Sequence, residues 1–268
     1  TTITRTDLTL ANGTTYYISI RSTDYVGNVS TTASSDGITV DTDVPVISEV
    51  VEGSATSVFS NTYSLSFDGV DDYVEVPYSS GFNNFTDAIS VMAWVKITGN
   101  QGSQQTIIEN GDVKGFALAI TNDLRIYPHL KTTAGWFALP IGSSMEMDTW
   151  QHVAFTYNGS ALIGFLNGQE IGSLSVSGTI DNNDGNLNFG FDSNWQHYFN
   201  GNIDDVSIWN TALTQAEIQS YMNNPPSGNE SGLVGYWNFN VGTGTTAYDA
   251  TSNDNDGTIY GATWSEDV

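Results

Sequence analysis

Hydrophobic and polar residues alternate over short stretches along most of this chain. From Ser64 to Pro77, Leu65 and Phe67 alternate with polar residues before an Asp-Gly turn, and Val74 and Val76 do so after it. Alternation with a period of two is typical of half-buried β-strands, and Asp-Gly favours a tight turn because glycine reaches positive φ at little cost. This stretch therefore predicts a pair of strands joined by an acidic turn.

Similar runs recur roughly every ten residues beyond residue 61, a spacing typical of all-β domains. Asn-Gly pairs at 158–159 and 167–168 predict hairpin turns. Many short strands separated by turns predict an all-β sandwich or barrel. The further strands that we predict are 89–97, 106–109, 115–121, 124–130, 135–141, 151–158, 161–166, 187–191 and 203–209.

One helix is expected late in the chain. Thr214-Gln-Ala-Glu217 has the sequence of a capping box, in which the side chains of the first and fourth residues each accept a backbone N–H. Ile218 and Tyr221 follow at helical spacing, and Pro225 marks the end.

Charge and composition narrow the function. The 268 residues carry a net charge of −24 and no cysteine. Such an acidic chain is a poor partner for nucleic acid, and no apolar run is long enough to insert into a membrane. The chain lacks an initiator Met and a signal peptide, so we expect a segment of a longer secreted protein with covalent neighbour domains. Because the chain cannot form disulfides, we expect bound calcium to stabilise the fold where carboxylates are dense.

The first 43 residues resemble the last strands of a fibronectin type III-like or bacterial immunoglobulin-like domain. The run Leu10-Ala-Asn-Gly-Thr-Thr-Tyr-Tyr-Ile-Ser-Ile carries this resemblance. We expect residues 1–43 to be a C-terminal fragment of such a domain and residues 44–60 to be a linker.

Four motifs together resemble laminin G-like domains of the concanavalin A-like lectin superfamily: SFDGVDDYVEVP, WQHVAFTYNG, FLNGQEIGS and GNIDDVSIWNTALTQAEI. The resemblance implies a jelly roll of two antiparallel sheets over 61–268, with a concave face that often carries ligand. It also implies a secreted or surface-attached bacterial protein. Residues 232–264 resemble the segment that usually opens such domains. We expect them to close the sandwich in permuted order; a truncated second domain is the alternative.

The sequence gives no catalytic signature. Relatives that hydrolyse glycosides carry closely spaced acidic residues on one strand, whereas Glu109 and Asp112 have the wrong spacing. No nucleophile motif is present, and the three histidines are too scattered to suggest a metal triad. We therefore expect the carboxylates, Glu109 included, to be solvated at the surface.

Calcium prefers hard oxygen ligands, and three acidic places offer them. They are the turn 68–72, the pair at 204–205 and the loop 249–256. The resemblance implies a cation shared by a late-strand acid, Asp204, and an early-strand acid, Asp68; solvated turns are the alternative. The candidate metal ligands are Asp68, Asp204, Asp249, Asn253 and Asp256.

A small basic region stands out in the acidic chain. Residues 113 to 145 include three cationic side chains and only one carboxylate, Asp123. Alternation places Leu124, Ile126 and Leu130 toward the core and the intervening side chains on the other face. Cations beside aromatic rings suit a sugar that carries sulfate or carboxylate, although a solvated face is the alternative. The candidate ligand-binding residues are Lys114, Arg125, Tyr127, His129, Lys131 and Trp136, with a second group of Trp195, His197 and Tyr198. We expect Trp94, Trp150, Trp209 and Trp237 in the core.

These observations predict a non-catalytic carbohydrate-binding module that binds a polysaccharide. They favour an anionic, sulfated algal glycan as the ligand and calcium as a stabiliser of the loops. One alternative is a cell-adhesion or protein-interaction module. The other is a glycoside hydrolase or lyase with an unrecognised site.

Overall fold

The computed structural model describes residues 61–268 except 80, 83, 112–113, 139 and 183, together with four two-residue strands in the first 60 residues. The chain divides into two compact units, Thr1–Ser60 and Asn61–Val268. In the first unit, β1 (Thr15–Tyr16) pairs with β4 (Ile38–Thr39), and β2 (Ser19–Ile20) pairs with β3 (Ala33–Ser34). The expected fibronectin-like fragment and linker otherwise lie outside the described residues.

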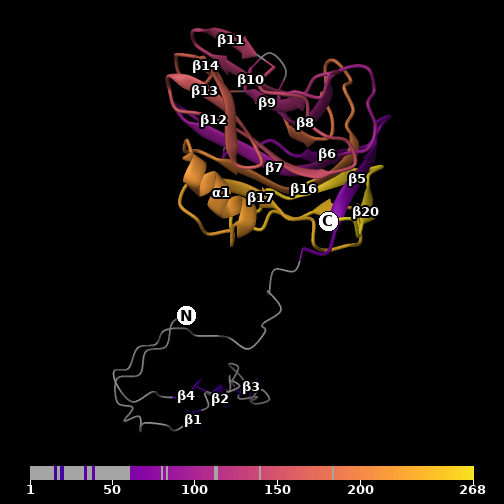
Figure 1. The fold of residues 1–268 in the computed structure, drawn as a ribbon, viewed down its shortest axis with the longest axis vertical. Coiled ribbons are helices and arrows are strands. Elements are labelled where there is room, and N and C mark those ends of the chain that lie inside the picture. The colour runs from indigo at the N-terminus through magenta and orange to yellow at the C-terminus, as the bar shows by residue number, and fades with distance from the viewer. Residues whose placement is uncertain are drawn as a thin grey trace. The chain divides into compact units, whose positions relative to one another are not determined.

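The second unit is a sandwich of two antiparallel sheets, shown in Figure 1. Sheet I has the order β11 (Gly135–Ala138), β10 (Ile126–Thr132), β9 (Phe116–Ile120), β8 (Gln105–Asn110), β15 (Leu187–Phe189), β6 (Tyr73–Val76), β19 (Gly257–Tyr260) and β18 (Thr246–Ala247). Sheet II has the order β14 (Gln169–Ser175), β13 (Ala161–Leu166), β12 (Trp150–Tyr157), β7 (Ile89–Ile97), β16 (Asn200–Trp209), β5 (Ser64–Asp68) and β20 (Thr263–Ser265), and β17 (Leu233–Trp237) also pairs with β16. The predicted all-β jelly-roll class is confirmed.

The acidic turn connects the two sheets. Strands β5 and β6 flank it as predicted, but they do not pair with each other: β5 pairs with β16 and β20, whereas β6 pairs with β15 and β19. Gly69 has φ +78°, and the backbone N–H of Val70 donates to the Asp68 side chain at 2.8 Å. The prediction of a strand pair was wrong because a hairpin and a crossing between sheets have the same local sequence.

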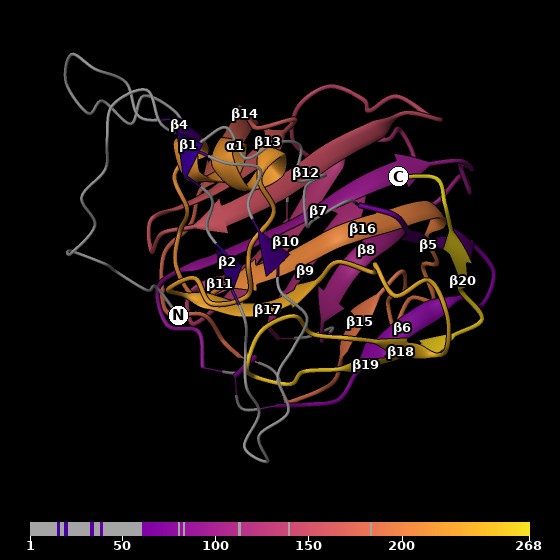
Figure 2. The same ribbon diagram turned by 90° about the horizontal axis from the view of Figure 1, so that it is seen from below.

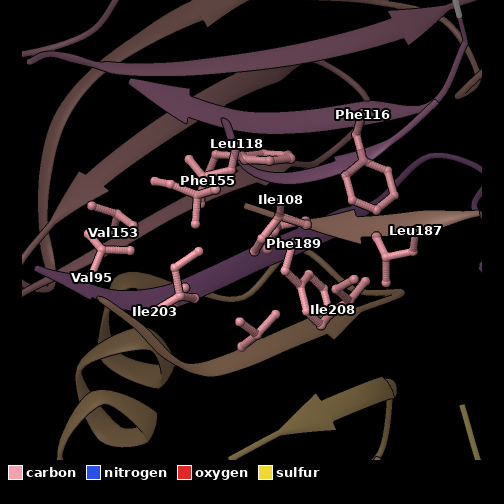
Figure 3. Close-up of a cluster of buried hydrophobic side chains, with 14 of the residues drawn as sticks. Val95, Ile108, Phe116, Leu118, Val153, Phe155, Leu187, Phe189, Ile203 and Ile208 are labelled. Carbon is pink, nitrogen blue, oxygen red and sulfur yellow. The ribbon is translucent and has the colours of Figure 1, made fainter. Parts of the chain in front are cut away.

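The core fills the space between the sheets. Figure 3 shows Val95, Val153 and Phe155 of sheet II meeting Ile108 and Leu118 of sheet I, all fully buried. Burial of such side chains from water is the main stabilising contribution to a sandwich. Trp209 and Trp237 are fully buried as predicted, whereas Trp94 and Trp150 are only half-buried on the outer face of sheet II. The core assignment of those two residues was therefore wrong.

Helix α1 (Gln215–Asn223) covers part of the outer face of sheet II (Figure 1). Thr214 is its N-cap, and both hydrogen bonds of the predicted capping box to Glu217 are present. Ile218 packs with Met92 and Trp209 in a second hydrophobic cluster. Within the described residues, no helix has the length and apolar character needed to cross a membrane.

The C-terminal segment adds strands to both sheets, as Figure 2 shows from below. Strand β17 pairs with β16 in sheet II, and β19 pairs with β6 in sheet I. Strand β20 pairs with β5. The tail therefore completes the same sandwich, and helix α1 packs on sheet II rather than on sheet I.

Candidate functional site

The outer face of sheet I carries the side chains that alternation predicted for β10. Ile126 and Leu130 are fully buried in the core, and Tyr127, His129 and Lys131 are partly exposed on the opposite face. This alternation follows from the pleat of the strand.

The strand register brings a carboxylate onto the same face. His129 lies opposite Ala117 of β9, and Ala117 lies opposite Glu109 of β8. Directly paired residues of neighbouring strands project from the same side of a sheet. Since alanine is small, its side chain leaves a hollow between His129 and Glu109.

This hollow is a cavity of about 390 Å³ on the outer face of sheet I. It unites five of the predicted ligand residues and adds others that sequence reasoning missed. The residues that line it are Gln104, Glu109, Gly111, Ala117, Tyr127, His129, Trp136, Asp192, Trp195 and His197. Lys114, Arg125, Lys131 and Tyr198 are not among them.

Two tryptophans at the cavity expose much of their surface to solvent. Trp136 on β11 is 42% exposed, and Trp195 in the loop after β15 is 72% exposed. Asp192 fixes this loop, because its Oδ1 accepts the backbone N–H groups of Asn194 at 3.0 Å and Trp195 at 2.9 Å. These hydrogen bonds therefore fix the backbone of Trp195 at the edge of the cavity.

Two histidines place ring nitrogens beside these indoles. The His129 ring meets Tyr127 edge-on, with centroids 4.3 Å apart. Burial lowers the pKa of His129 to about 4; nearby Asp192 opposes this shift and His197 adds to it. His129 is therefore neutral at pH 7. Its Nε2 atom and the Nδ1 atom of His197 are buried without a hydrogen-bond partner.

Two carboxylates in the cavity were not predicted. Glu109 is only 1% exposed, and it accepts hydrogen bonds from the side chain of Asn188 and the backbone of Ser193, both at 3.3 Å. The expectation that Glu109 is solvated at the surface was therefore wrong. A β-bulge between Thr106 and Ile108 shifts the alternation along β8. The sequence pattern therefore did not indicate which face of the sheet carries the Glu109 side chain. Asp192 is 6% exposed, and only the aromatic residues that follow it hint at a site.

The predicted cations lie elsewhere. Lys114 forms an ion pair with Asp181 at 3.5 Å, and Arg125 donates to Asp123 at 2.8 Å in the turn before β10. Lys131 lies opposite Trp136 in the β10–β11 register without lining the cavity.

Tyr198 belongs to a separate row of aromatic rings. It stacks on Phe191 with centroids 4.7 Å apart, and Phe191 contacts Tyr73 at 5.3 Å. Tyr73 stacks in turn on Tyr260 at 4.6 Å. The loop that carries His197 and Tyr198 therefore joins the cavity to an aromatic row over β6 and β19.

The acidic turn contains the metal-ligand candidate Asp68. One side-chain oxygen each from Asp68, Asp71 and Asp72 lies within 4.8 Å of the others. Burial raises the pKa of Asp72. These donors are hard oxygens, which suit calcium.

Asp204 cannot share a cation with Asp68. Asp68 lies opposite Asn200 on β16, and four residues of extended strand, about 13 Å, separate Asn200 from Asp204. Asp204 is instead 1% exposed on the outer face of sheet II, where Asn61 donates to it at 2.5 Å. Burial raises its pKa, and the neighbouring carboxyl of Asp205 adds to this shift. The expectation of a shared cation was therefore wrong.

Asp249 holds its loop together by hydrogen bonds. Its carboxylate accepts backbone N–H groups of Tyr236, Thr251 and Asn255 at 2.9–3.0 Å and the Thr251 hydroxyl at 2.8 Å. The other two candidates are also engaged: Asp256 accepts the backbone N–H of Asp249, and the side chain of Asn253 donates to a backbone carbonyl. The protein itself therefore supplies partners throughout this loop.

The family follows from comparison with known proteins. The laminin G-type family model described as the concanavalin A-like lectin/glucanases superfamily matches residues 68–219. The chain belongs to this superfamily. The matched segment runs from the acidic turn to helix α1 and includes all the residues that line the cavity.

Several individual proteins are similar to this superfamily member. A candidate carbohydrate-binding protein from Bacteroides ovatus aligns over 96% of this chain and 70% of its own, with 19% identity and a TM-score of 0.62. The CBM40 domain of a Ruminococcus gnavus IT-sialidase, solved with α2,3-sialyllactose, aligns over 60% of this chain and 98% of its own, with 15% identity and a TM-score of 0.48. An asparagine-rich protein of Margaritifera margaritifera is 35% identical over 88 residues, 31% of this chain, and the match spans 12% of that protein's length.

Proposed function

We propose that this chain is a non-catalytic carbohydrate-binding module that binds a polysaccharide at the cavity on sheet I. The observation that carries the proposal is the combination of two exposed tryptophans, Trp136 and Trp195, with buried polar groups in one cavity. Indole rings stack on the apolar C–H face of a sugar, while carboxylate and imidazole groups accept or donate hydrogen bonds to its hydroxyls. The Bacteroides protein of similar fold, itself a candidate carbohydrate-binding protein, supports this reading.

The ligand in this proposal is a chain rather than a single sugar. The aromatic row from Tyr198 to Tyr260 continues from the cavity loop across sheet I. A polysaccharide bound at the cavity therefore has further ring surfaces to contact. An extended, shallow contact of this kind gains affinity when the module is repeated or tethered to others.

Calcium has a structural role in this proposal. The carboxylates of Asp68, Asp71 and Asp72 would hold the ion at the turn that connects the sheets. Bound there, calcium supplies positive charge that offsets the repulsion among three carboxylates. The setting that we propose is a secreted or surface-attached bacterial protein with neighbouring domains.

The test is binding of residues 61–268 to a glycan array, followed by affinity electrophoresis in gels that contain single polysaccharides. We expect retardation by at least one polysaccharide, and loss of it in the double variant Trp136→Ala, Trp195→Ala. If no polysaccharide in the panel slows the domain, the proposal fails and a protein-interaction module becomes the better reading.

One observation favours a second candidate, a glycoside hydrolase. Glu109 and Asp192 both line the cavity, and glycosidases use a pair of carboxylates. Incubation with the same polysaccharides distinguishes the two functions, since only hydrolysis releases new reducing ends. If the wild type releases reducing ends and Glu109→Gln does not, while binding is retained, the protein is an enzyme rather than a binding module.

A further inference from the structure

We infer that the cavity takes an uncharged sugar residue and discriminates against sulfated or carboxylated ones. This inference rests on the proposed function and names its ligand class. It departs from the anionic glycan that the basic region of the sequence favours, because that preference depended on cations which do not line the cavity.

The charged groups of the cavity are acidic. Glu109 and Asp192 line it, and no lysine or arginine is among its lining residues. Both carboxylates are almost fully buried, at 1% and 6% exposure, so water screens their charge poorly. A sulfate brought beside them would meet like charge with little compensation.

The polar groups suit hydroxyls instead. Each carboxylate accepts hydrogen bonds only, and a sugar hydroxyl can donate one while accepting another from an N–H group. His129, neutral at pH 7, faces Tyr127, Trp136, Asp192 and His197, and it contributes a hydrogen-bonding ring rather than a positive charge. Buried ring nitrogens on His129 and His197 have no hydrogen-bond partner among the described residues, and the hydroxyls of a bound sugar can supply one.

The surroundings of the cavity reinforce this preference. Lys114 and Arg125 are already paired with Asp181 and Asp123. Lys131 lies opposite Trp136 on the same face, but this single cation is outnumbered by the two carboxylates that line the cavity. The chain as a whole carries a charge of −24, which repels a polyanion as it approaches.

The decisive experiment compares matched pairs of ligands. Several neutral polysaccharides, such as agarose, galactomannan, xyloglucan and mixed-linkage β-glucan, are tested beside chemically sulfated derivatives of the same polymers. We expect the domain to bind at least one neutral polymer at least tenfold more tightly than its sulfated form. We also expect affinity for the neutral polymer to change less than twofold between 50 and 500 mM NaCl.

Two variants test the electrostatic cause. Gln104→Lys introduces a cation into the cavity, and Asp192→Asn removes a charge while keeping an acceptor for the loop. Each should lower the neutral-to-sulfated affinity ratio at least threefold, and thermal unfolding verifies that each variant is folded. Lys96→Ala, which removes a cation from β7 of the other sheet, should leave the ratio unchanged. The inference is overturned if both folded cavity variants leave the ratio unchanged.

The outcomes separate the two claims. If a sulfated polymer binds at least as tightly as its neutral parent, and the tryptophan variants abolish that binding, this inference falls while the carbohydrate-binding function stands. If neither neutral nor sulfated polymers bind, both fall together.

Discussion

The rings of His129 and Trp136 meet edge to face across strands β10 and β11, with centroids 5.8 Å apart and planes inclined by 75°. The sequence separates them by seven positions, but the hairpin brings both to the cavity. This contact orients the indole while leaving 42% of Trp136 exposed, as a surface that stacks on a sugar requires.

Trp136→Ala should weaken polysaccharide binding about tenfold, or about 1.4 kcal/mol, because one stacking surface is lost. The midpoint of thermal unfolding should change little, since the ring is partly solvated. Tyr248→Ala, which removes another exposed ring outside the cavity, is the matched control and should retain full affinity. Equal losses in the two variants would show that Trp136 has no special role.

Burial lowers the pKa of His152 to about 4, below the 6.5 of an unfolded histidine. The folded state therefore binds fewer protons than the unfolded state between pH 6.5 and 4, and stability from this group is lost as pH falls through that window. We expect the stability advantage of the wild type over His152→Gln to shrink by about 1–3 kcal/mol between pH 7 and 4. Urea unfolding at several pH values measures it, and a constant difference would contradict the assignment.

Asp204 shows the opposite dependence, because burial and Asp205 raise its pKa in the folded state. Its ionisation destabilises the fold as pH rises above the ordinary range of an aspartate. Asp204→Asn cannot ionise, so its stability relative to the wild type should increase by at least about 1 kcal/mol between pH 5 and 9. A variant that follows the wild type at every pH would refute the raised pKa.

Asp249→Ala should destabilise the domain by about 2–4 kcal/mol. The substitution leaves the backbone N–H groups of Tyr236, Thr251 and Asn255 without their acceptor, and buried unpaired donors are costly. Glu266→Ala, a change at an exposed carboxylate in the same C-terminal segment, should stay within about 0.5 kcal/mol of the wild type. Urea denaturation of the three proteins provides the comparison.

Calcium should raise the unfolding temperature of metal-free protein, and EGTA should reverse the increase. A ligand that binds only the folded state stabilises it by an amount that grows with the logarithm of its concentration relative to its dissociation constant. Asp71→Asn should reduce this response, whereas Asp249→Asn should retain it, because the Asp249 loop is closed by protein hydrogen bonds. An unfolding temperature indifferent to both calcium and EGTA would eliminate the metal from the proposal.

The strands and the helix were largely predictable. The predicted bounds of β7 and β13 coincide with those observed, and the capping box at Thr214 and Glu217 forms as expected. Strand β14 was missed because it lies at the edge of sheet II with most of its side chains at least partly exposed, which weakens the apolar pattern.

The candidate site was predicted only in part. Tyr127, His129 and Trp136 lie close in sequence, so alternation along one hairpin was enough to group them. Glu109 and Asp192 come from β8 and from the loop after β15, and they reach the cavity through the pairing of distant strands. The basic region in the sequence was misleading, because Arg125 pairs with Asp123 in the same turn and the fold places Asp181 beside Lys114.

The sequence by itself determined the class of fold, the positions of most strands and the helix cap, because these depend on backbone conformation and on side chains within a few residues of one another. Only the tertiary structure decided that β5 and β6 belong to different sheets, that Asp68 and Asp204 lie too far apart to share an ion, and that the cavity is acidic. Those properties depend on which distant strands pair and in what register, and the free energy that fixes this choice is spread over the whole core.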